Sequence, residues 1–216
     1  MFNLLWPIIA GYLIGSIPTA FLAVRWKSNL DIREAGSGNV GTLNSYVVTG
    51  SKGLGLIVLV VDLLKGVAAA LVGRALVPQL PFIGVAVAGS AAVLGHSYPV
   101  WLKFRGGRGL APAAGAMGSV CIPLVAAWMA AWGIGFALSR AVNVASFIAC
   151  CILLGVLLAV PDEVIRAVLP DGATTRGLRA FGVLLLAIML SRLIGPLREY
   201  VRDRRTSKRT EEGEAS

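Results

Sequence analysis

Long apolar runs separated by short basic segments constrain this chain more than any other feature of its sequence. Of its 216 residues, 56% are hydrophobic and only 14% are charged, whereas a soluble domain carries roughly 25% charged residues. The excess apolar surface needs a lipid environment, and each bilayer crossing needs roughly 20 apolar residues. The sequence therefore predicts an all-α integral membrane protein that crosses the bilayer several times.

The apolar runs predict seven transmembrane helices. The run from Leu110 to Leu138 is too long for one crossing at ~1.5 Å per residue, and we divide it at Pro123 into a short fourth span and a fifth. Residues 1–200 then form one polytopic domain, and the charged segment 201–216 is expected to be a disordered tail. The other five spans are Leu4–Val24, Leu54–Leu76, Phe82–Leu102, Val144–Val160 and Leu178–Leu197.

The distribution of Lys and Arg predicts the orientation of these spans. With the N-terminus outside, most of the basic residues, including Arg140 and those of the C-terminal tail, fall on the cytoplasmic side, as the positive-inside rule requires. A single span over 110–138 would put Arg140 and the tail outside, so the charges favour seven spans over six. The net charge of +9 sits between and after apolar runs. That placement suits anionic membrane lipids, and we expect no nucleic-acid partner.

The cysteines do not have the spacing of metal ligands. Cys121, Cys150 and Cys151 all fall in apolar runs without a histidine nearby. They are expected to be small core residues, and no metal site is predicted.

A first glycine-rich polar segment follows the first span. Its glycines favour backbone conformations in which several N–H groups point at one anion, so it is a candidate phosphate-binding loop. A plain turn between two helices is the alternative. The segment reads Gly36-Ser37-Gly38-Asn39-Val40-Gly41-Thr42-Leu43-Asn44.

A second polar segment follows the third span. Three cations, Lys103, Arg105 and Arg108, flank the pair Gly106-Gly107. The first of these cations follows His96, the only histidine of the chain, by seven residues. Together these residues suit a phosphate site at the membrane surface. The alternatives are a positive-inside anchor for the cations and a hydrogen-bonded interfacial role for His96.

Further polar residues interrupt the apolar runs. Asp62 and Lys65 lie three apart on one helical face, where buried charges pair with each other or serve a function; Lys65 could instead extend to the interface. Asn143 and Ser146 begin the sixth span, and Arg192 lies near the end of the seventh. In the predicted topology these elements and the two glycine-rich segments converge on the cytoplasmic face.

The order of these motifs resembles that of the bacterial acyl-phosphate:glycerol-3-phosphate acyltransferases, the PlsY family. The resemblance covers roughly 11–146. The matching motifs are Gly15-Ser16-Ile17-Pro18, Asp31-Ile32-Arg33, Gly36-Ser37-Gly38-Asn39-Val40-Gly41, Asp62-Leu63-Leu64-Lys65-Gly66, Gly95-His96-Ser97-Tyr98-Pro99-Val100 and Phe104-Arg105-Gly106-Gly107-Arg108-Gly109.

The resemblance implies a fold, a reaction and a set of partners. It implies a seven-helix protein of the bacterial plasma membrane with its N-terminus outside and its active site on the cytoplasmic face. The reaction moves a fatty acyl group from acyl phosphate to the sn-1 hydroxyl of glycerol 3-phosphate, giving lysophosphatidic acid without a cofactor. A soluble acyltransferase that forms the acyl phosphate is a candidate partner.

The resemblance also implies roles for individual residues. Lys65, His96 and Arg108 are the expected catalytic residues, with either His96 or a phosphate oxygen of the substrate as the base. Arg105 and Arg108 are expected to bind phosphate and stabilise the leaving group. The expected substrate- and phosphate-binding residues are Gly36, Ser37, Gly38, Asn39, Asn44, Lys103, Arg105, Gly106, Gly107, Asn143 and Ser146.

Some positions depart from the family pattern. Val47 stands where the family typically has Arg, and Leu193 and Pro196 stand where it commonly has His and Asn. Asn143 replaces a frequent Ser, and Arg105 and Arg108 replace Lys, which keeps the charge but changes the hydrogen-bond geometry. The alternative function is a non-catalytic membrane protein that binds or carries a lipid phosphate or another anion.

Overall fold

The computed structural model describes residues 3–214, with side chains described for all of them except 205 and 207–214. Throughout this range the regular structure is helical, which confirms the all-α part of the prediction. The helices are α1 Leu5–Ser16, α2 Thr19–Ser28, α3 Thr42–Thr49, α4 Lys52–Leu76, α5 Pro81–Ser97, η1 Val100–Leu102, α6 Leu110–Gly118, α7 Ile122–Ser139, α8 Val142–Ala159, α9 Asp162–Arg166 and α10 Thr175–Glu214.

Six stretches of the described chain are long and apolar enough to cross a membrane. They are Leu5–Ser28, Lys52–Leu76, Pro81–Leu102, Ile122–Ser139, Val142–Ala159 and Thr175–Arg204. The predicted division of 110–138 is also present, because the helix ends at Gly118 and Pro123 lies in the first turn of α7. The nine residues of α6 measure about 14 Å, roughly half the thickness of the hydrocarbon core.

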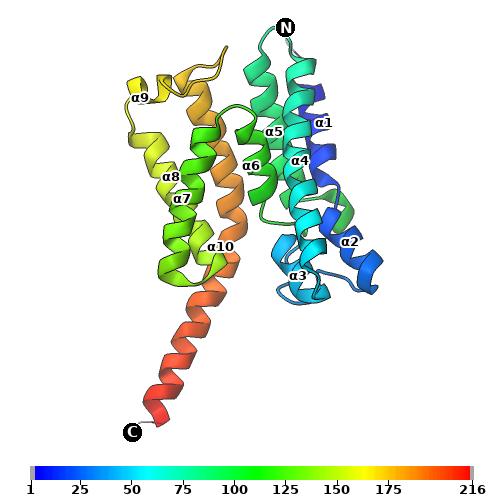
Figure 1. Cartoon of the computed structure of the whole chain (residues 1–216), viewed down its shortest axis with the longest axis vertical. Helices are drawn as coiled ribbons and strands as arrows, with labels where there is room; N and C mark the ends of the chain where they lie inside the picture. The colour runs from blue at the N-terminus through cyan, green and yellow to red at the C-terminus, as the bar shows by residue number, and fades with distance from the viewer. Residues whose placement is uncertain (1–2, 215–216) are drawn as a thin grey trace.

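The helices form two groups that meet at α6. Helices α1, α4 and α5 pack against one another, and α8 packs against both α7 and α10. Helix α6 contacts α4, α5 and α7, and α10 also contacts α5 (Figure 1). The two ends of the chain lie at opposite ends of the molecule, with the N-terminus at the top of this view and the C-terminus at the bottom.

Small residues bring the helices of the first group together. A side chain at Gly15 would collide with the backbone of Ala92 on α5, and one at Gly66 of α4 would collide with the backbone of Pro112 on α6. Without water as a driving force, such close backbone approach is a main source of helix association in membranes. The packing fixes α4 and α5, which carry the buried polar residues described below.

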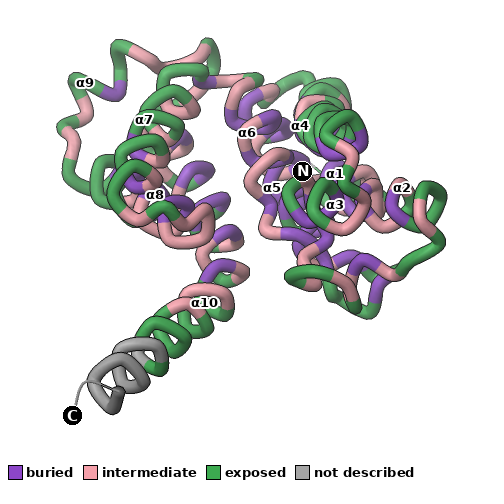
Figure 2. The backbone as a smooth tube through the Cα atoms, turned by 60° about the horizontal axis from the view of Figure 1, so that its bottom comes forward, coloured by how far each residue is buried: buried purple, intermediate pink, exposed green. Residues whose placement is uncertain are grey.

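Two apolar clusters stabilise the molecule (Figure 2). The larger lies among α5, α6, α7, α8 and α10 and includes Phe181, Leu157 and Leu193. The smaller joins α2, the loop after it, α4 and η1. It therefore holds the first glycine-rich segment next to the start of the second. Its buried members are Ala20, Val24, Ile32, Val40, Leu54, Val58 and Leu102.

Helix α10 extends further than the sequence predicted. The segment 201–216 was expected to be disordered, but α10 continues to Glu214, and residues 215–216 lie outside the described residues. Arg, Lys and Glu favour helix, and Pro196 lies inside α10 without ending it. The described side chains of 201–204 and 206 are exposed, so they do not contribute to the hydrophobic core.

Candidate functional site

Three segments that are distant in sequence meet at the candidate site. They are the loop 29–41 between α2 and α3, the segment 98–109 between α5 and α6, and the part of α10 around Arg192. Part of the segment before α6 lies inside the bundle, because Leu102, Gly106, Gly107 and Gly109 are buried. Irregular backbone at such depth is tolerated where it is buried in protein or lines a cavity.

Asn44 shapes the first loop from inside. The residue is buried at the start of α3, and its Nδ2 donates to the carbonyl oxygens of Ile32, Ala35 and Asn39 at 3.0–3.2 Å. Its Oδ1 accepts from the backbone N–H of Ser37 at 2.9 Å. Direct contact between Asn44 and a phosphate, as predicted from the sequence, is therefore not supported, because both ends of the amide already bind the loop.

The loop itself keeps polar groups at the surface. Gly36 and Gly38 adopt left-handed φ values of 58° and 67°, which favour glycine. A side chain at Gly36 would also collide with the Oδ1 of Asn44. Ser37 between them is exposed and Asn39 is half-buried, so both remain accessible to a ligand.

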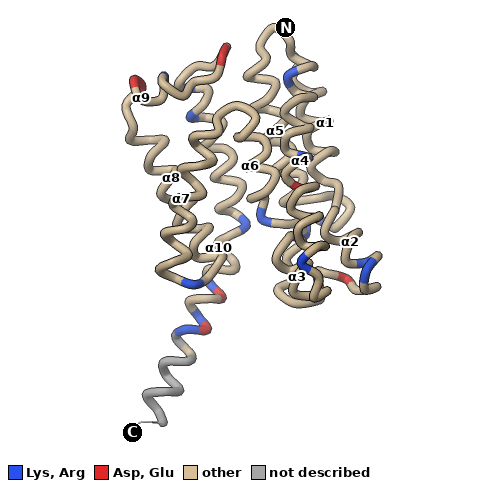
Figure 3. The backbone as a smooth tube through the Cα atoms, viewed as in Figure 1, with Lys and Arg blue, Asp and Glu red and all other residues tan. Residues whose placement is uncertain are grey.

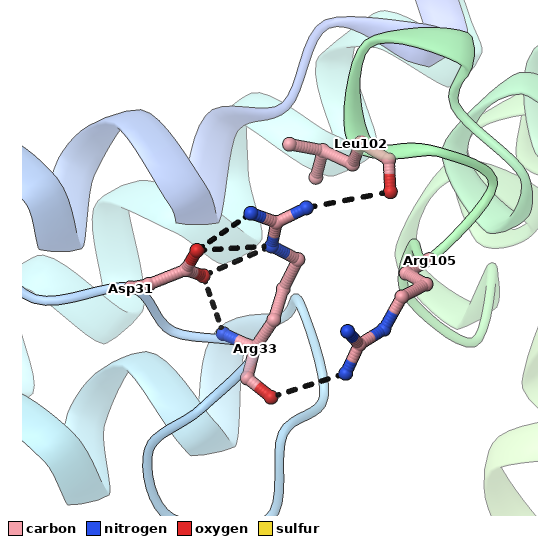
Figure 4. A network of polar contacts seen from close by, with 4 residues as sticks. All are labelled: Asp31, Arg33, Leu102 and Arg105. Carbon is pink, nitrogen blue, oxygen red and sulfur yellow. Dashed lines mark hydrogen bonds and ion pairs between the residues drawn. The ribbon is translucent and has the colours of Figure 1, made fainter.

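Hydrogen bonds of two arginines connect this loop to the second segment, and an ion pair within the loop orients one of them (Figure 4). The guanidinium of Arg33 binds the carboxylate of Asp31 at 2.6 Å and reaches the carbonyl oxygen of Leu102 at 3.5 Å. Arg105 in turn donates to the carbonyl oxygen of Arg33 at 3.5 Å. The hydrogen bond from Arg33 lowers the pKa of Asp31 to about 2, so this carboxylate is charged at neutral pH.

The Gly106-Gly107 turn lies directly on His96. Its two glycines are buried, and the N–H of Gly107 donates to the carbonyl oxygen of His96 at 3.1 Å. A side chain at Gly106 would collide with that carbonyl oxygen, and one at Gly107 would collide with the Nε2 of the imidazole. Close packing, rather than backbone conformation, is therefore the reason for this glycine pair.

Arg192 holds the same turn from the other side. Its guanidinium donates to the carbonyl oxygens of Gly106 at 2.9 Å and Gly107 at 3.2 Å, and lies over the ring of Tyr98. Sequence reasoning placed Arg192 on the correct face but did not predict a site role for it. The available signal was a cation inside the apolar run 178–197.

Arg108 is the one cation of the segment 98–109 that is not exposed. Its side chain is half-buried, and its Nε is buried without a hydrogen-bond partner among the described residues. Burial lowers the pKa of Arg108, and the charge of Arg192 lowers it further. No ion pair of Arg108 with a described carboxylate is present. Lys103 and Arg105 are exposed nearby.

Asp62, Lys65 and His96 form a buried polar cluster beneath the turn. The Nζ of Lys65 lies 2.9 Å from the Oδ1 of Asp62, and the Nδ1 of His96 lies 3.9 Å from the same oxygen. Lys65 also donates to the carbonyl oxygen of Ile17 at 2.6 Å and to the hydroxyl of Thr19 at 3.3 Å. Lys65 is thus bound by protein groups on α4 and at the break between α1 and α2.

Asn143 and Ser146 do not join the site. The hydroxyl of Ser146 donates to the carbonyl oxygen of Val142 at 2.8 Å and accepts from the Nε1 of Trp132 at 3.2 Å. It therefore stabilises the packing of α7 on α8. Asn143 is half-buried in the first turn of α8, and no contact with either glycine-rich segment is recorded among the described residues. The predicted convergence holds for three of the four elements.

The described part of the chain holds no cluster of three or more His, Cys, Asp or Glu side chains that could bind a metal ion. Cys121 and Cys150 are buried, as expected of core residues, whereas Cys151 is exposed on α8.

An apolar groove leads away from the arginines. It lies between α6, α7, α8 and α10 and has a volume of about 50 Å³. Leu110, at its near end, follows Gly109, and Met189 lies one helical turn before Arg192. The site thus combines cations and a glycine turn with an adjoining apolar surface.

Comparison with known proteins identifies the family. A family profile described as "Glycerol-3-phosphate acyltransferase" matches residues 5–199. This chain belongs to the glycerol-3-phosphate acyltransferase family. The resemblance inferred from the motifs is thereby confirmed.

Relatives in this family match parts of the chain. A glycerol-3-phosphate acyltransferase of Myxococcus xanthus (strain DK1622) is 48% identical over 110 residues, which are 51% of this chain and 56% of the relative. One of Synechococcus sp. (strain JA-2-3B'a(2-13)) is 40% identical over 149 residues, covering 69% of this chain and 72% of the relative. The chain thus spans about half the length of the first of these relatives.

Solved structures of the family match almost the whole fold. The crystal structure of PlsY (YgiH), an integral membrane glycerol 3-phosphate acyltransferase, in its glycerol 3-phosphate form superimposes with a TM-score of 0.75. The sequences are 28% identical, and 93% of each chain is covered. The lysophosphatidic acid form of that protein matches with a TM-score of 0.73.

The departures from the family pattern have distinct structural settings. Leu193 is fully buried in the larger apolar cluster, and Pro196 lies within α10. Val47 is exposed on α3. In this member of the glycerol-3-phosphate acyltransferase family, Leu193 therefore serves packing.

Proposed function

We propose that this chain transfers a fatty acyl group from acyl phosphate to the sn-1 hydroxyl of glycerol 3-phosphate, giving lysophosphatidic acid for phospholipid synthesis. In this reaction the hydroxyl oxygen attacks the acyl carbonyl carbon, and the carbon–oxygen bond to phosphate breaks. Both substrates are anionic, so the site must neutralise two phosphates and align the reacting atoms. Alignment can supply ~7–11 kcal/mol of barrier reduction, and charges aimed at the developing oxyanion supply more.

The observation that carries the proposal is the pair of arginines at the Gly106-Gly107 turn. Arg192 binds the turn itself, while Arg108 is half-buried, has a buried Nε without a described partner, and forms no ion pair with a described carboxylate, although the charge of Glu199 acts on it from nearby. Two like charges in a partly buried place repel each other unless an anion lies between them. A phosphate group supplies that anion, and arginine binds phosphate through two parallel hydrogen bonds.

The apolar groove supports a lipid substrate. It begins at Leu110 and Met189, beside the arginines, and is lined by Trp128, Leu157 and other apolar side chains. An acyl chain in this groove would place the acyl phosphate at the turn. Neither acyl-CoA nor an adenine group has a matching feature in the sequence, so acyl phosphate is the proposed donor.

We assign roles to the residues accordingly. Arg108 stabilises the leaving phosphate, and Arg105 and Lys103 attract anions at the entrance. The exposed Ser37 and half-buried Asn39, with the loop glycines Gly36 and Gly38, hold the second phosphate. Gly106 and Gly107 place the turn. His96 supports the turn from beneath, and Lys65 binds the break between α1 and α2. Asn143 and Ser146 have no assigned contact with substrate.

We further propose seven crossings of a bacterial plasma membrane, with the N-terminus outside and the site facing the cytoplasm. The opposite positions of the chain ends and the direction of α6 suit an odd number of crossings. In Figure 3 basic residues gather on α2 and on the lower part of α10, with a few acidic residues among them, at the end of the molecule opposite α9. The basic end is the cytoplasmic one by the positive-inside rule. A soluble enzyme that forms acyl phosphate would deliver the donor there.

The test is transfer of labelled glycerol 3-phosphate into lipid by the purified protein, with either acyl phosphate or acyl-CoA as donor. We expect lysophosphatidic acid from acyl phosphate and much slower transfer from acyl-CoA. Equal turnover with acyl-CoA would contradict the donor assignment. Binding of either phosphate compound with no product from either donor would favour the non-catalytic alternative.

A further inference from the structure

We propose that Asp62 is a positioning residue of the acyl transfer: through Lys65 and His96 it fixes the two irregular segments beside the site, Ile17–Thr19 and the Gly106-Gly107 turn. The proposal rests on the proposed function for its catalytic consequence. Its structural part can be tested without any activity.

The first step is the isolation of the Asp62 carboxylate. The residue is 2% exposed, in the middle of the apolar helix α4. Lys65 is its ion-pair partner at 2.9 Å and His96 approaches the same oxygen to 3.9 Å, yet Oδ1 has no well-aligned hydrogen bond among the described residues. An ion in an apolar interior is costly even when paired. A hydrophobic pair of similar volume would stabilise packing as well, so a purely structural role does not explain these charges.

The second step is the pair of hydrogen bonds that the Lys65 ammonium donates in addition to its ion pair with Asp62. It donates to the carbonyl oxygen of Ile17 and to the hydroxyl of Thr19, at the break between α1 and α2. Pro18 lies in this break and has no N–H. Lys65 therefore ties the break to α4, and its ion pair with the Asp62 carboxylate orients the lysine toward the break.

The third step is the position of His96. The Nδ1 of the His96 ring faces Asp62, and the Nε2 of the same ring packs on Gly107. The carbonyl oxygen of His96 accepts a hydrogen bond from the N–H of Gly107. Movement of the imidazole would displace the turn that precedes Arg108. Asp62 attracts the side of the ring that faces away from the turn, so the carboxylate and the turn together hold the ring in one orientation.

These contacts predict that Asp62 acts on turnover more than on folding. A displacement of about 1 Å at a reacting group can lower the rate on the order of a hundredfold. We therefore expect Asp62→Asn to reach the membrane as folded protein and to lose on the order of a hundredfold in kcat. The KM for glycerol 3-phosphate will change much less. The same variant will exchange the amide hydrogens of the peptide containing residues 104–109 faster than the unmodified protein.

A charge-swapped variant separates positioning from simple pairing. D62K/K65D keeps an ion pair at the same spacing on the same helix, but a carboxylate at 65 cannot donate to Ile17 and a cation at 62 faces His96. If the pair only stabilises the bundle, D62K/K65D will recover full turnover, and the proposal is wrong. If Asp62 positions the two segments, the swap will restore the yield of folded protein without restoring kcat or amide protection.

Two further outcomes distinguish a failure of the positioning role of Asp62 from a failure of the proposed acyl transfer. Should the unmodified protein fail to transfer the acyl group, the proposed function fails, and amide exchange in Asp62→Asn alone then decides the positioning role. Should D62K/K65D not fold, Asp62→Asn decides in the same way. Unchanged kcat together with unchanged exchange at 104–109 in Asp62→Asn overturns the proposal.

Discussion

The guanidinium of Arg192 lies over the ring of Tyr98, with its central carbon 5.1 Å from the ring centroid. The hydroxyl of the same tyrosine hydrogen-bonds the hydroxyl of Ser191 at 2.7 Å. Helix α10 is thus attached to the segment after α5 at two consecutive residues, and this attachment brings Arg192 to the carbonyl oxygens of the glycine turn.

Arg192→Ala will lower turnover roughly tenfold to a hundredfold. The change removes two charge-assisted hydrogen bonds, each worth ~1.5–3 kcal/mol, and a contact with an aromatic ring. Arg192→Lys will recover only part of the rate, because an ammonium cannot reproduce the planar fork. The measurement is kcat for acyl transfer, with the exposed Arg198→Ala as the matched cation control on the same helix. An equal loss in both alanine variants would contradict a specific role.

Arg108→Ala will abolish most transfer while leaving folded protein in the membrane. Removal of one preorganised charge-stabilising donor costs ~2.7–4 kcal/mol, or about a hundred- to a thousandfold in rate. Arg108→Lys will recover part of the activity because the charge remains. Steady-state kinetics of purified variants check this, with the exposed Lys27→Ala on α2 as control. Near-normal turnover in Arg108→Ala would contradict the catalytic role and indicate that the basic segment serves only to orient the protein in the membrane.

Asn44→Ala will destabilise the first loop by about 1–3 kcal/mol, because buried carbonyl groups and the Ser37 N–H lose their partner. Asn44→Asp will not rescue it, since an aspartate keeps the acceptor for Ser37 but lacks the three donor contacts of Nδ2. Thermal unfolding in detergent measures the loss, and the KM for glycerol 3-phosphate will rise in both variants. A normal melting temperature with raised KM would instead point to direct ligand contact by Asn44.

The Asp31–Arg33 pair predicts an acid-sensitive contribution to stability. Because the folded-state pKa of Asp31 is about 2, below its ordinary value of 3.8, the contribution is fully present above pH ~4 and is lost as the pH falls toward 2. Its size is at most about 1 kcal/mol, since the pair is partly open to water. Asp31→Asn will flatten the pH dependence of unfolding in that interval. An unchanged pH profile in this variant would show that the ion pair contributes nothing.

Cysteine labelling tests the topology. In a Cys151→Ser background, which removes the exposed native cysteine, Thr206→Cys will react only with reagent on the cytoplasmic side, and Asp171→Cys only with reagent outside. Seven crossings put these positions on opposite faces. Labelling of both from the same side would contradict the proposed arrangement.

The sequence by itself determined the class of this protein and the elements of its site. Apolar runs of membrane-spanning length demand helices because lipid leaves backbone groups no other partners, and Pro123 and its neighbours predicted the break that separates α6 from α7. The motif from Gly36 to Asn44, with that around Gly106, predicted the family. Such features can be predicted from the sequence because each depends on a few consecutive residues.

The tertiary structure decided which polar side chains bind other parts of the protein and which have no described protein partner. No pattern in the sequence distinguishes Lys65 from Arg108, but Lys65 is bound by Ile17 and Thr19, while Arg108 keeps a buried Nε without a described partner. Asn44 turned inward to hold its own loop, Ser146 joined the packing of α7 on α8, and Arg192 entered the site from a helix far along the chain. These outcomes depend on contacts between segments far apart in the chain, such as that between Arg192 and Gly106, which are 86 residues apart. Only the packing of the helices establishes them.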